Sequence, residues 1–580
     1  MIIINSGAYV APELQAEFGA IPPCMLPLAN KKLIEHQVRA LSVAFPGQAI
    51  LVSLPAQYVL TEHDAALLDR LGVRVVQTPD NFSLCAALMY ILSAVASAQD
   101  HVRLLRGDTL FGDFPKGLDL VSVAPSPDDY KRERERLSIG DGLQMPPVCE
   151  QLKGFEERAD AGAQADDGGR TETAGRARMG AGPQAETGDR ARIEAGRQTG
   201  ARANDLVWTG FFAFSSVRLL LRSLALAKDS FTEAVKLYAR ECSVYSAPAG
   251  RWFDLGHINT YFRSRSALTT QRAFNTLNVD ANIVTKTGTP PQKIEAEANW
   301  FQQVPRQIKK YIPQLISHGH EAGQPYYQLE YLPLSPLNEL FVHGRNSVSF
   351  WEYAFDLIED FFIDAASVTP DEAVVRDAAR KLYADKTRQR LRMFTDAEGL
   401  ASDRPLRYAG EELPPLQEIC EDCLRKTLDL PCAPGILHGD LCLSNILIDL
   451  RSDNIKVIDP RGLDNDGRQT IYGDQKYDLA KLAHSCIGLY DFIISGYYRL
   501  ESANPYDYAL HFVPDERLLA VQAKFWNKRF LPQCAVADIL PLTVLLFFSM
   551  LPLHSDDHTK QQALFANALR LYRTHVRNSG

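Results

Sequence analysis

The sequence predicts an α/β protein built from two domains. The chain has 580 residues, more than a single hydrophobic core normally accommodates. Its first part alternates short apolar runs with helical patterns, and its last part is mostly helical around a strand-rich centre at 435–459. These observations predict a mainly parallel sheet in the first domain, and a small mixed lobe followed by a larger helical lobe in the second.

The first domain, residues 1–265, is expected to contain βαβ units. Its strands are short apolar runs: Ile2–Ile4, Ala49–Val52, Val73–Val76 and Val102–Leu105. Its helices carry apolar residues at helical spacing: Leu33–Phe45, Glu62–Leu71 and Ser83–Ala96. Strands that alternate with helices in this way favour parallel pairing.

Residues 155–205 interrupt the first domain. The segment is rich in Ala, Gly, Arg, Asp and Glu and has almost no large apolar residue. Such a composition cannot bury enough surface to offset the entropy of ordering it. We therefore expect a disordered, low-complexity insertion.

The second domain, residues 270–580, begins with two strand-like runs around Val279–Lys286 and Tyr326–Tyr331. They flank a helix that carries Glu295 and Glu297. The apolar stretch Ile539–Leu553 is too short for a membrane span and contains two prolines, so a buried helix is expected.

Composition limits the possible partners. Apolar residues make up 46% and charged residues 23% of the chain, as in ordinary globular proteins. The net charge of -9 leaves no basic surplus for nucleic-acid phosphates, so no nucleic-acid partner is expected. The start of the chain has no basic, apolar signal pattern, which favours a cytoplasmic protein without membrane insertion. The oligomeric state is left open.

Three polar residues in the strand-rich centre form a pattern typical of phosphoryl transfer. The run Gly435–Asp449 contains Asp440 and Asn445, and Asp459 ends the next strand. Phosphoryl transfer requires a carboxylate beside the acceptor hydroxyl and oxygen ligands for the metal on the ATP phosphates. Asp440 is predicted to orient and deprotonate the hydroxyl, while Asn445 and Asp459 are predicted to bind Mg²⁺.

The motif His438-Gly-Asp440, with Asn445 and Asp459 after it, resembles the aminoglycoside phosphotransferase and choline kinase superfamily. The stretch Tyr472–Ser485 is similar to kinase-like proteins of capsular polysaccharide clusters. The resemblance implies a two-lobed, protein-kinase-like fold that uses ATP and Mg²⁺ to phosphorylate a small-molecule hydroxyl. It leaves the acceptor open among a sugar, heptose, polyol, amino alcohol or glycerate.

The residues that contact the ATP phosphates are expected in the small lobe. Lys286 lies at a strand end, and Glu297 on the following helix is its expected ion-pair partner. Lys293 and Glu295 compete for the same roles. The segment has no Gly-rich loop beyond Thr287-Gly288-Thr289.

Residues 1–265 resemble sugar nucleotidyltransferases of the Rossmann-like, GT-A-like type. The resemblance is carried by Pro22–Gln37, Leu104–Phe111 and Trp252–His257. It implies that Asp108 and Asp254 bind Mg²⁺ between sugar phosphate and nucleotide, which is CTP or another NTP. The chain departs from the family at the phosphate-binding groups, with Pro23 at the lysine position and only Ser6–Tyr9 in place of the Gly-rich loop. Lys31, Lys32 or Arg106 could supply the missing positive charge.

The two resemblances together imply a kinase whose product is then activated by nucleotidyl transfer, as in families associated with capsule or surface polysaccharide. The alternative is a kinase joined to a degenerate first domain that acts as a sensor or scaffold. A protein kinase is disfavoured, because the loop reads His-Gly-Asp and not His-Arg-Asp.

Overall fold

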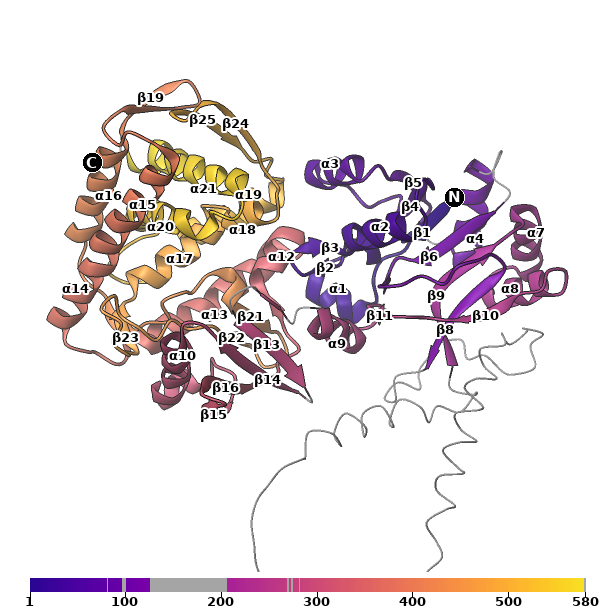
Figure 1. Cartoon of the computed structure of the whole chain (residues 1–580), viewed down its shortest axis with the longest axis horizontal. Helices are drawn as coiled ribbons and strands as arrows, with labels where there is room; N and C mark the ends of the chain where they lie inside the picture. Colours follow the sequence, from indigo (N-terminus) through magenta and orange to yellow (C-terminus); the bar gives the residue numbers. More distant parts are fainter. Residues whose placement is uncertain are drawn as a thin grey trace, which may run out of the picture.

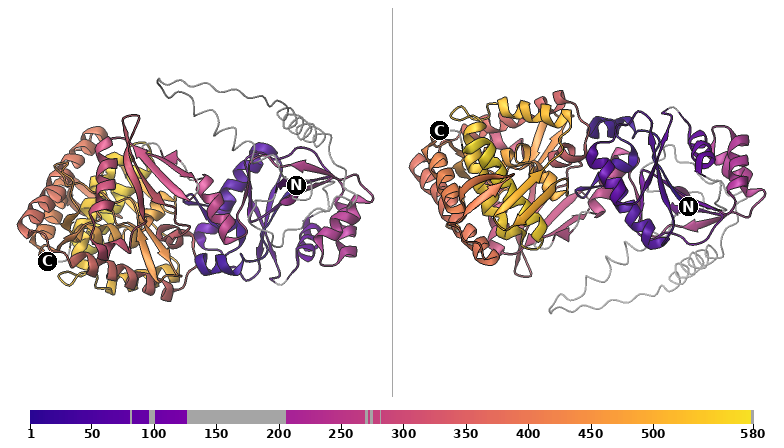
Figure 2. Two further views of the ribbon diagram at one scale, coloured as in Figure 1. Left: turned by 90° about the horizontal axis from the view of Figure 1, so that it is seen from below. Right: turned by 90° about the horizontal axis from the view of Figure 1, so that it is seen from above.

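The computed structural model describes residues 1–80, 82–95, 101–125, 206–268, 271–272, 275–280 and 282–577. The chain forms two parts that lie side by side, residues 1–268 in one and the remainder in the other (Figures 1 and 2). The predicted insertion at 155–205 lies outside the described residues.

A seven-stranded mixed sheet forms the centre of the first part, in the order β10-β8-β9-β6-β1-β4-β5. The strands are β1 (Ile2–Asn5), β4 (Ile50–Pro55), β5 (Arg74–Thr78), β6 (Val102–Arg106), β8 (Leu120–Pro125), β9 (Leu206–Phe214) and β10 (Tyr245–Pro248). The expected parallel arrangement is confirmed for β6-β1-β4-β5. Strand β9 departs from it, because it runs antiparallel to both β6 and β8.

Helices cover both faces of this sheet, since alternate residues of its strands point to opposite sides. In β1, Ile2 and Ile4 belong to one buried cluster, whereas Ile3 belongs to the other. The first cluster receives helices α1 (Pro12–Phe18), α2 (Leu33–Ala44) and α3 (Glu62–Arg70). The second receives α4 (Leu84–Val95), α7 (Val217–Ala227) and α8 (Phe231–Ala239).

The second part opens with a five-stranded sheet in the order β12-β13-β14-β16-β15. Its strands are β12 (Gln271–Arg272), β13 (Asn275–Asp280), β14 (Ile283–Gly288), β15 (Leu315–Glu321) and β16 (Gln324–Glu330), and helix α10 (Pro291–Gln303) packs on it. The single strand expected at Val279–Lys286 is wrong, because a hairpin turn divides it into β13 and β14. Asn282 in that turn has φ 69°, a left-handed conformation that asparagine tolerates better than most residues.

The larger lobe is mostly helical. Its helices include α12 (Leu337–His343), α13 (Val348–Ala366), α14 (Glu372–Arg380), α15 (Lys386–Glu398), α16 (Leu416–Asp429), α17 (Lys476–Cys486), α18 (Tyr490–Ile494), α19 (Glu516–Asn527), α20 (Leu540–Met550) and α21 (His558–Leu571). Every residue of α20 is buried. Within the described residues, only the segment Ala537–His554 is long and apolar enough to span a membrane, and 72% of it is buried in the fold. The structure therefore confirms the expected buried helix.

The two parts meet across a packed interface with a charged centre. Arg345, just after α12, bonds Asp64 of the first part at 3.1 Å and Asp515 of the second at 3.1 Å. Its backbone N–H also donates to the carbonyl of Phe18 at 2.7 Å. Lys32 pairs with the other oxygen of Asp64, and both side chains are buried. One apolar cluster continues from the first part into the second.

Candidate active sites

The catalytic-loop candidate lies between β20 (Pro434–Ile436) and β21 (Ile446–Asp449). Gly439 adopts φ 81°, so a glycine is required at the turn before Asp440. The carboxylate of Asp478, at the start of α17, accepts the backbone N–H groups of His438 at 2.7 Å and Gly439 at 2.8 Å. These bonds tie helix α17 to the loop.

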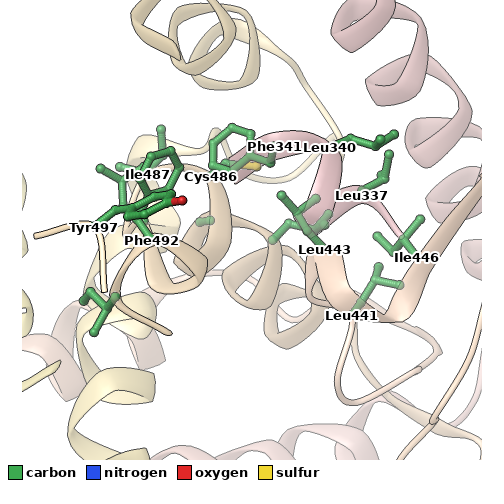
Figure 3. Close-up of a cluster of buried hydrophobic side chains, with 14 of the residues drawn as sticks. Leu337, Leu340, Phe341, Leu441, Leu443, Ile446, Cys486, Ile487, Phe492 and Tyr497 are labelled. Carbon is green, nitrogen blue, oxygen red and sulfur yellow. The ribbon is translucent and has the colours of Figure 1, made fainter. Parts of the chain in front are cut away.

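An apolar cluster anchors the loop in the core (Figure 3). Leu441, Leu443 and Ile446 of the loop are buried together with Leu337 of α12 and Cys486 of α17. The apolar side chains of Leu441, Leu443 and Ile446 are thus buried in the core, while Asp440 and Ser444 remain partly exposed. The apolar positions of the motif therefore set the direction of its polar ones.

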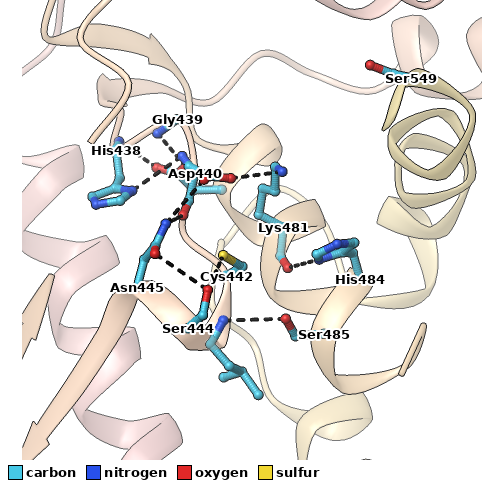
Figure 4. Close-up of polar contacts among 12 residues, drawn as sticks. His438, Gly439, Asp440, Cys442, Ser444, Asn445, Lys481, His484, Ser485 and Ser549 are labelled. Atoms are coloured by element: carbon cyan, nitrogen blue, oxygen red, sulfur yellow. Dashed lines mark hydrogen bonds and ion pairs between the residues drawn. The ribbon is translucent and has the colours of Figure 1, made fainter. Parts of the chain in front are cut away.

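Asp440 lies at the centre of a polar network (Figure 4). Its Oδ1 is 2.8 Å from Nζ of Lys481 on α17, and 42% of its side chain is exposed. The Asn445 amide donates to the Asp440 carbonyl at 2.9 Å and to its Oδ2 at 3.2 Å. Burial alone would raise the pKa of Asp440, but the Lys481 ammonium lowers it to about 2. Asp440 is therefore an anion at neutral pH.

His438 supports the loop. It is fully buried, its Nδ1 accepts the N–H of Asp440 at 3.3 Å, and its ring lies edge-on to Trp300. Burial lowers its pKa to about 4, so the imidazole is neutral.

A second charged group joins the two lobes. Lys286 of β14 bonds Glu297 of α10 at 2.6 Å and Asp459 at 2.9 Å. Tyr327 donates its hydroxyl to Glu297 at 2.7 Å. Burial disfavours the charge of Lys286, but Asp459 and Glu297 outweigh this effect and raise its pKa.

Lys293 and Glu295, the alternative candidates for these two roles, lie nearer the surface. Lys293 is 3.8 Å from Glu297 and half exposed, and Glu295 pairs with His320 at the surface. Of these four candidate residues, Lys286 and Glu297 are the two that are buried.

A cavity of about 280 Å³ connects these groups. Its wall includes Lys286, Asn445 and Asp459. Ala29 and Phe262 of the first part close another side. Since Asn445 also bonds Asp440, the cavity and the catalytic-loop carboxylate belong to one site.

Asp108 and Asp254 are brought together in the first part. Strand β7 (Thr109–Phe111) pairs antiparallel with β11 (Trp252–Asp254), which places Asp254 opposite Thr109. A Cβ added at Gly256 would lie 2.5 Å from Asp108 Oδ2 and 3.4 Å from Asp254 Oδ1. Both carboxylates therefore border one point, where only glycine fits.

The positive groups suggested for this second site are only partly suited to it. Lys32 is buried in its ion pair with Asp64 at the interface, so it does not replace the missing phosphate-binding lysine. Its suggestion as a substitute is wrong, because the tertiary fold gives its charge another partner. Lys31 is exposed, and the side chain of Arg106 lies along Gly210.

Oxygen donors at both sites suit Mg²⁺. No group of three or more His, Cys, Asp or Glu side chains gathers to hold a metal in the described ranges. Asn445 with Asp459, and Asp108 with Asp254, each supply two oxygen-bearing side chains. This number fits Mg²⁺, which commonly shares its coordination between one or two carboxylates and substrate phosphates.

Some contacts were not predicted from the sequence. Lys481 was the main omission at the catalytic loop; it lies three residues after Asp478 and therefore on the same face of α17.

Cys420 and Cys423 have the CxxC spacing, yet both are buried on α16, and burial raises the pKa of the Cys420 thiol to about 12. They form no reactive thiol site.

Comparison with known families agrees with this geometry. Residues 274–497 match the model of the phosphotransferase enzyme family. This part of the chain is a phosphotransferase domain. The match contains Lys286, Asp440, Asn445 and Asp459.

Solved structures resemble each part at low identity. A glucosamine kinase in complex with glucosamine, ADP and inorganic phosphate covers 54% of this chain and 82% of its own, at 14% identity and TM-score 0.32. An aminoglycoside 2′-phosphotransferase-IIIa mutant with GDP covers 52% of this chain and 89% of its own, at 12% identity and TM-score 0.33.

The first part resembles a nucleoside-diphosphate-sugar pyrophosphorylase from Vibrio cholerae RC9. That match covers 46% of this chain and 99% of the other, at 14% identity and TM-score 0.29. No curated protein sequence matches the chain.

Proposed function

We propose that the phosphotransferase domain transfers the γ-phosphoryl group of ATP to a hydroxyl of a small metabolite, a sugar, polyol or amino alcohol. The observation that carries this proposal is the continuity between Asp440 and the cavity lined by Lys286, Asn445 and Asp459. A base, a phosphate-binding cation and metal ligands thereby meet in one place, as phosphoryl transfer requires.

Each side chain has a distinct role in this proposal. Lys286, held by Glu297, contacts the ATP phosphates, and Asn445 and Asp459 hold Mg²⁺. The metal, when bound, neutralises charge on the phosphate oxygens. Asp440 accepts the hydroxyl proton as the acceptor oxygen bonds to the γ-phosphorus and the bond to the ADP oxygen breaks.

The test is a screen of ATP consumption with a library of sugars, polyols, amino alcohols and their acids, followed by mass spectrometry. A product heavier by one phosphoryl group, formed by the wild type and not by Asp440→Asn, supports the proposal. Equal ATP consumption by the wild type and Asp440→Asn would show that the measured ATP hydrolysis does not depend on Asp440.

A second activity, nucleotidyl transfer to the kinase product, is proposed for the first part of the chain. It is supported by the convergence of Asp108 and Asp254, which suits a Mg²⁺ bridging a sugar phosphate and CTP or another NTP. Such a cytoplasmic enzyme would supply an activated precursor for capsule or surface polysaccharide. A sensor or scaffold role is the alternative, favoured by the commitment of Lys32 to Asp64.

A further inference from the structure

Basic side chains gather on one side of Asp440. Lys481 reaches it from α17, at 2.8 Å. Arg461 packs against the loop, since a Cβ added at Gly439 would lie 2.7 Å from its Cβ. Arg390, on α15, donates to the carbonyl of Ser549 at 2.9 Å.

Lys386 completes this basic cluster, which we define as Lys386, Arg390, Arg461 and Lys481. Its side chain is half-buried, and this desolvation, together with the charges of Arg461, Arg390 and Lys481, lowers its pKa to about 6. Asp440 acts in the opposite direction and is outweighed. In the free protein Lys386 is therefore largely neutral at pH 7, and an anion bound to the cluster would favour its charged form.

Neighbouring basic residues on the same segment do have acidic partners. Arg388 forms a two-point bond with Glu421, and Lys381 pairs with Asp466 at 2.8 Å. Among the described residues, Lys386, Arg390 and Arg461 make no ion pair, and Asp440 is the carboxylate that Lys481 contacts. Arg388 and Lys381 thus have carboxylate partners of their own, whereas Lys386, Arg390 and Arg461 have none among the described residues.

The cluster is separate from the nucleotide cavity. The wall of that cavity includes Lys286, Asn445 and Asp459, and none of the four basic residues lines it. Positive charge beside Asp440, the proposed proton acceptor, but outside the nucleotide cavity can bind the acceptor substrate, which carries the reacting hydroxyl. Like charges held together in a poorly solvated site destabilise the free protein, and an anionic ligand removes that cost.

We propose that the acceptor carries an anionic group, a phosphate or a carboxylate, which binds the basic cluster while its hydroxyl faces Asp440. This inference rests on the proposed kinase function and specifies the charge of its acceptor: sugar phosphates, polyol phosphates and hydroxy acids are expected in preference to neutral or cationic metabolites. Arginine and lysine suit either anion, since both donate charge-assisted hydrogen bonds to oxygen.

The experiment compares matched acceptors in the full chain with ATP and Mg²⁺: glucose with glucose 6-phosphate, and glycerol with glycerol 3-phosphate and D-glycerate. Comparing the phosphorylated acceptors with D-glycerate shows whether the cluster prefers a phosphate or a carboxylate. We expect turnover of an anionic member, with kcat/KM about 100-fold or more above its neutral counterpart. For the accepted acceptor, Lys386→Gln and Arg390→Gln should each raise KM about 10- to 100-fold with little change in kcat.

Arg388→Gln is the matched control, because it removes a positive charge from the same helix at a residue paired with Glu421. It should leave KM unchanged. Lys386→Gln should also raise the Tm of the free protein by a few degrees, on the order of 2–4 °C, because folding no longer has to desolvate or deprotonate the Lys386 ammonium.

Two outcomes would overturn the inference alone, and a third would reject the proposed function on which it rests. The first is phosphorylation of a neutral acceptor with unaltered KM in Lys386→Gln, which would leave the kinase function intact. The second is a decrease in kcat without a change in KM in Lys386→Gln and Arg390→Gln, which would show that the cluster acts on the transferred phosphoryl group. The third is the absence of phosphoryl transfer to every acceptor, which would instead reject the proposed function itself.

Discussion

Lys481 and Asp440 form an ion pair in which Nζ and Oδ1 are 2.8 Å apart. The pair joins helix α17 to the catalytic loop and keeps the carboxylate ionised. Asp478 on the same helix binds the backbone of His438 and Gly439. One helix therefore fixes both the position and the charge of the proposed base.

Removing this ion pair should change the pH profile. In the wild type the pKa of Asp440 is about 2, so no acid limb from this group is expected in kcat/KM between about pH 5 and 8. In Lys481→Met, burial is no longer offset and raises the pKa of Asp440, so an acid limb should enter the measurable range. Lys481→Arg, which keeps the charge, should restore the flat profile; an unchanged profile in Lys481→Met would contradict the coupling.

The same pair should influence stability with pH. The folded-state pKa of Asp440 lies below its unfolded value near 3.8. Its contribution to stability is therefore present above about pH 4 and is lost as the pH falls toward 2. Comparing thermal unfolding of the wild type and Lys481→Met from neutral to acidic pH measures this contribution. The difference should shrink on acidification.

Asp440→Asn should nearly abolish phosphoryl transfer. The amide cannot accept the hydroxyl proton, and loss of a positioned base typically costs about 10²- to 10⁴-fold in rate. ATP binding should persist, because Asp440 does not line the nucleotide cavity. Single-turnover kinetics and calorimetry separate these effects. Near wild-type turnover would show that another group takes the proton.

Asp459→Ala should weaken binding of Mg·ATP as well as turnover. Its carboxylate lines the cavity and is bonded to Lys286 at 2.9 Å. Calorimetry with ATP, in the presence and absence of Mg²⁺, should show a loss mainly in the metal-dependent component. Asp466→Ala, which removes a surface carboxylate paired with Lys381, is the control. Equal Mg·ATP affinity in both variants would exclude Asp459 as a metal ligand.

Glu297→Gln and Glu295→Gln form a matched pair on helix α10. Glu297 is buried against Lys286, so losing its charge should raise the KM for ATP about tenfold or more. Glu295 bonds His320 at the surface, where an ion pair contributes about 1 kcal/mol at most. Its variant should match the wild type. Similar effects in both variants would contradict the assignment of Glu297.

Asp108→Asn tests nucleotidyl transfer in the first part. The assay supplies ATP, the accepted kinase substrate and each of CTP, UTP, GTP and dTTP, and measures pyrophosphate. We expect slow release with one nucleotide, lost in Asp108→Asn, because Asp108 and Asp254 would then no longer both present carboxylates at one point. With a fully active kinase, no release from any nucleotide would leave this part a binding or scaffold module.

The sequence alone predicted several of the helices and strands of this protein and supplied the candidate residues of its sites. Local alternation of apolar residues was sufficient for strands β1, β4, β5 and β6 and helices α2, α3 and α4, because periodicity depends on near neighbours. It did not reveal the other three strands of the central sheet. The order His438, Asp440, Asn445, Asp459 likewise lies within one short stretch, so its spacing was readable.

Tertiary structure decided which charges meet. Lys286 and Asp459 are separated by 173 positions in the chain, and Lys32 and Asp64 belong to an interface that no local pattern reveals. Lys481 and the basic cluster come from segments spread between α15 and α17. Charge pairing depends on long-range packing and burial, whereas periodicity does not, so the sequence supplied the candidate groups and the fold selected their partners.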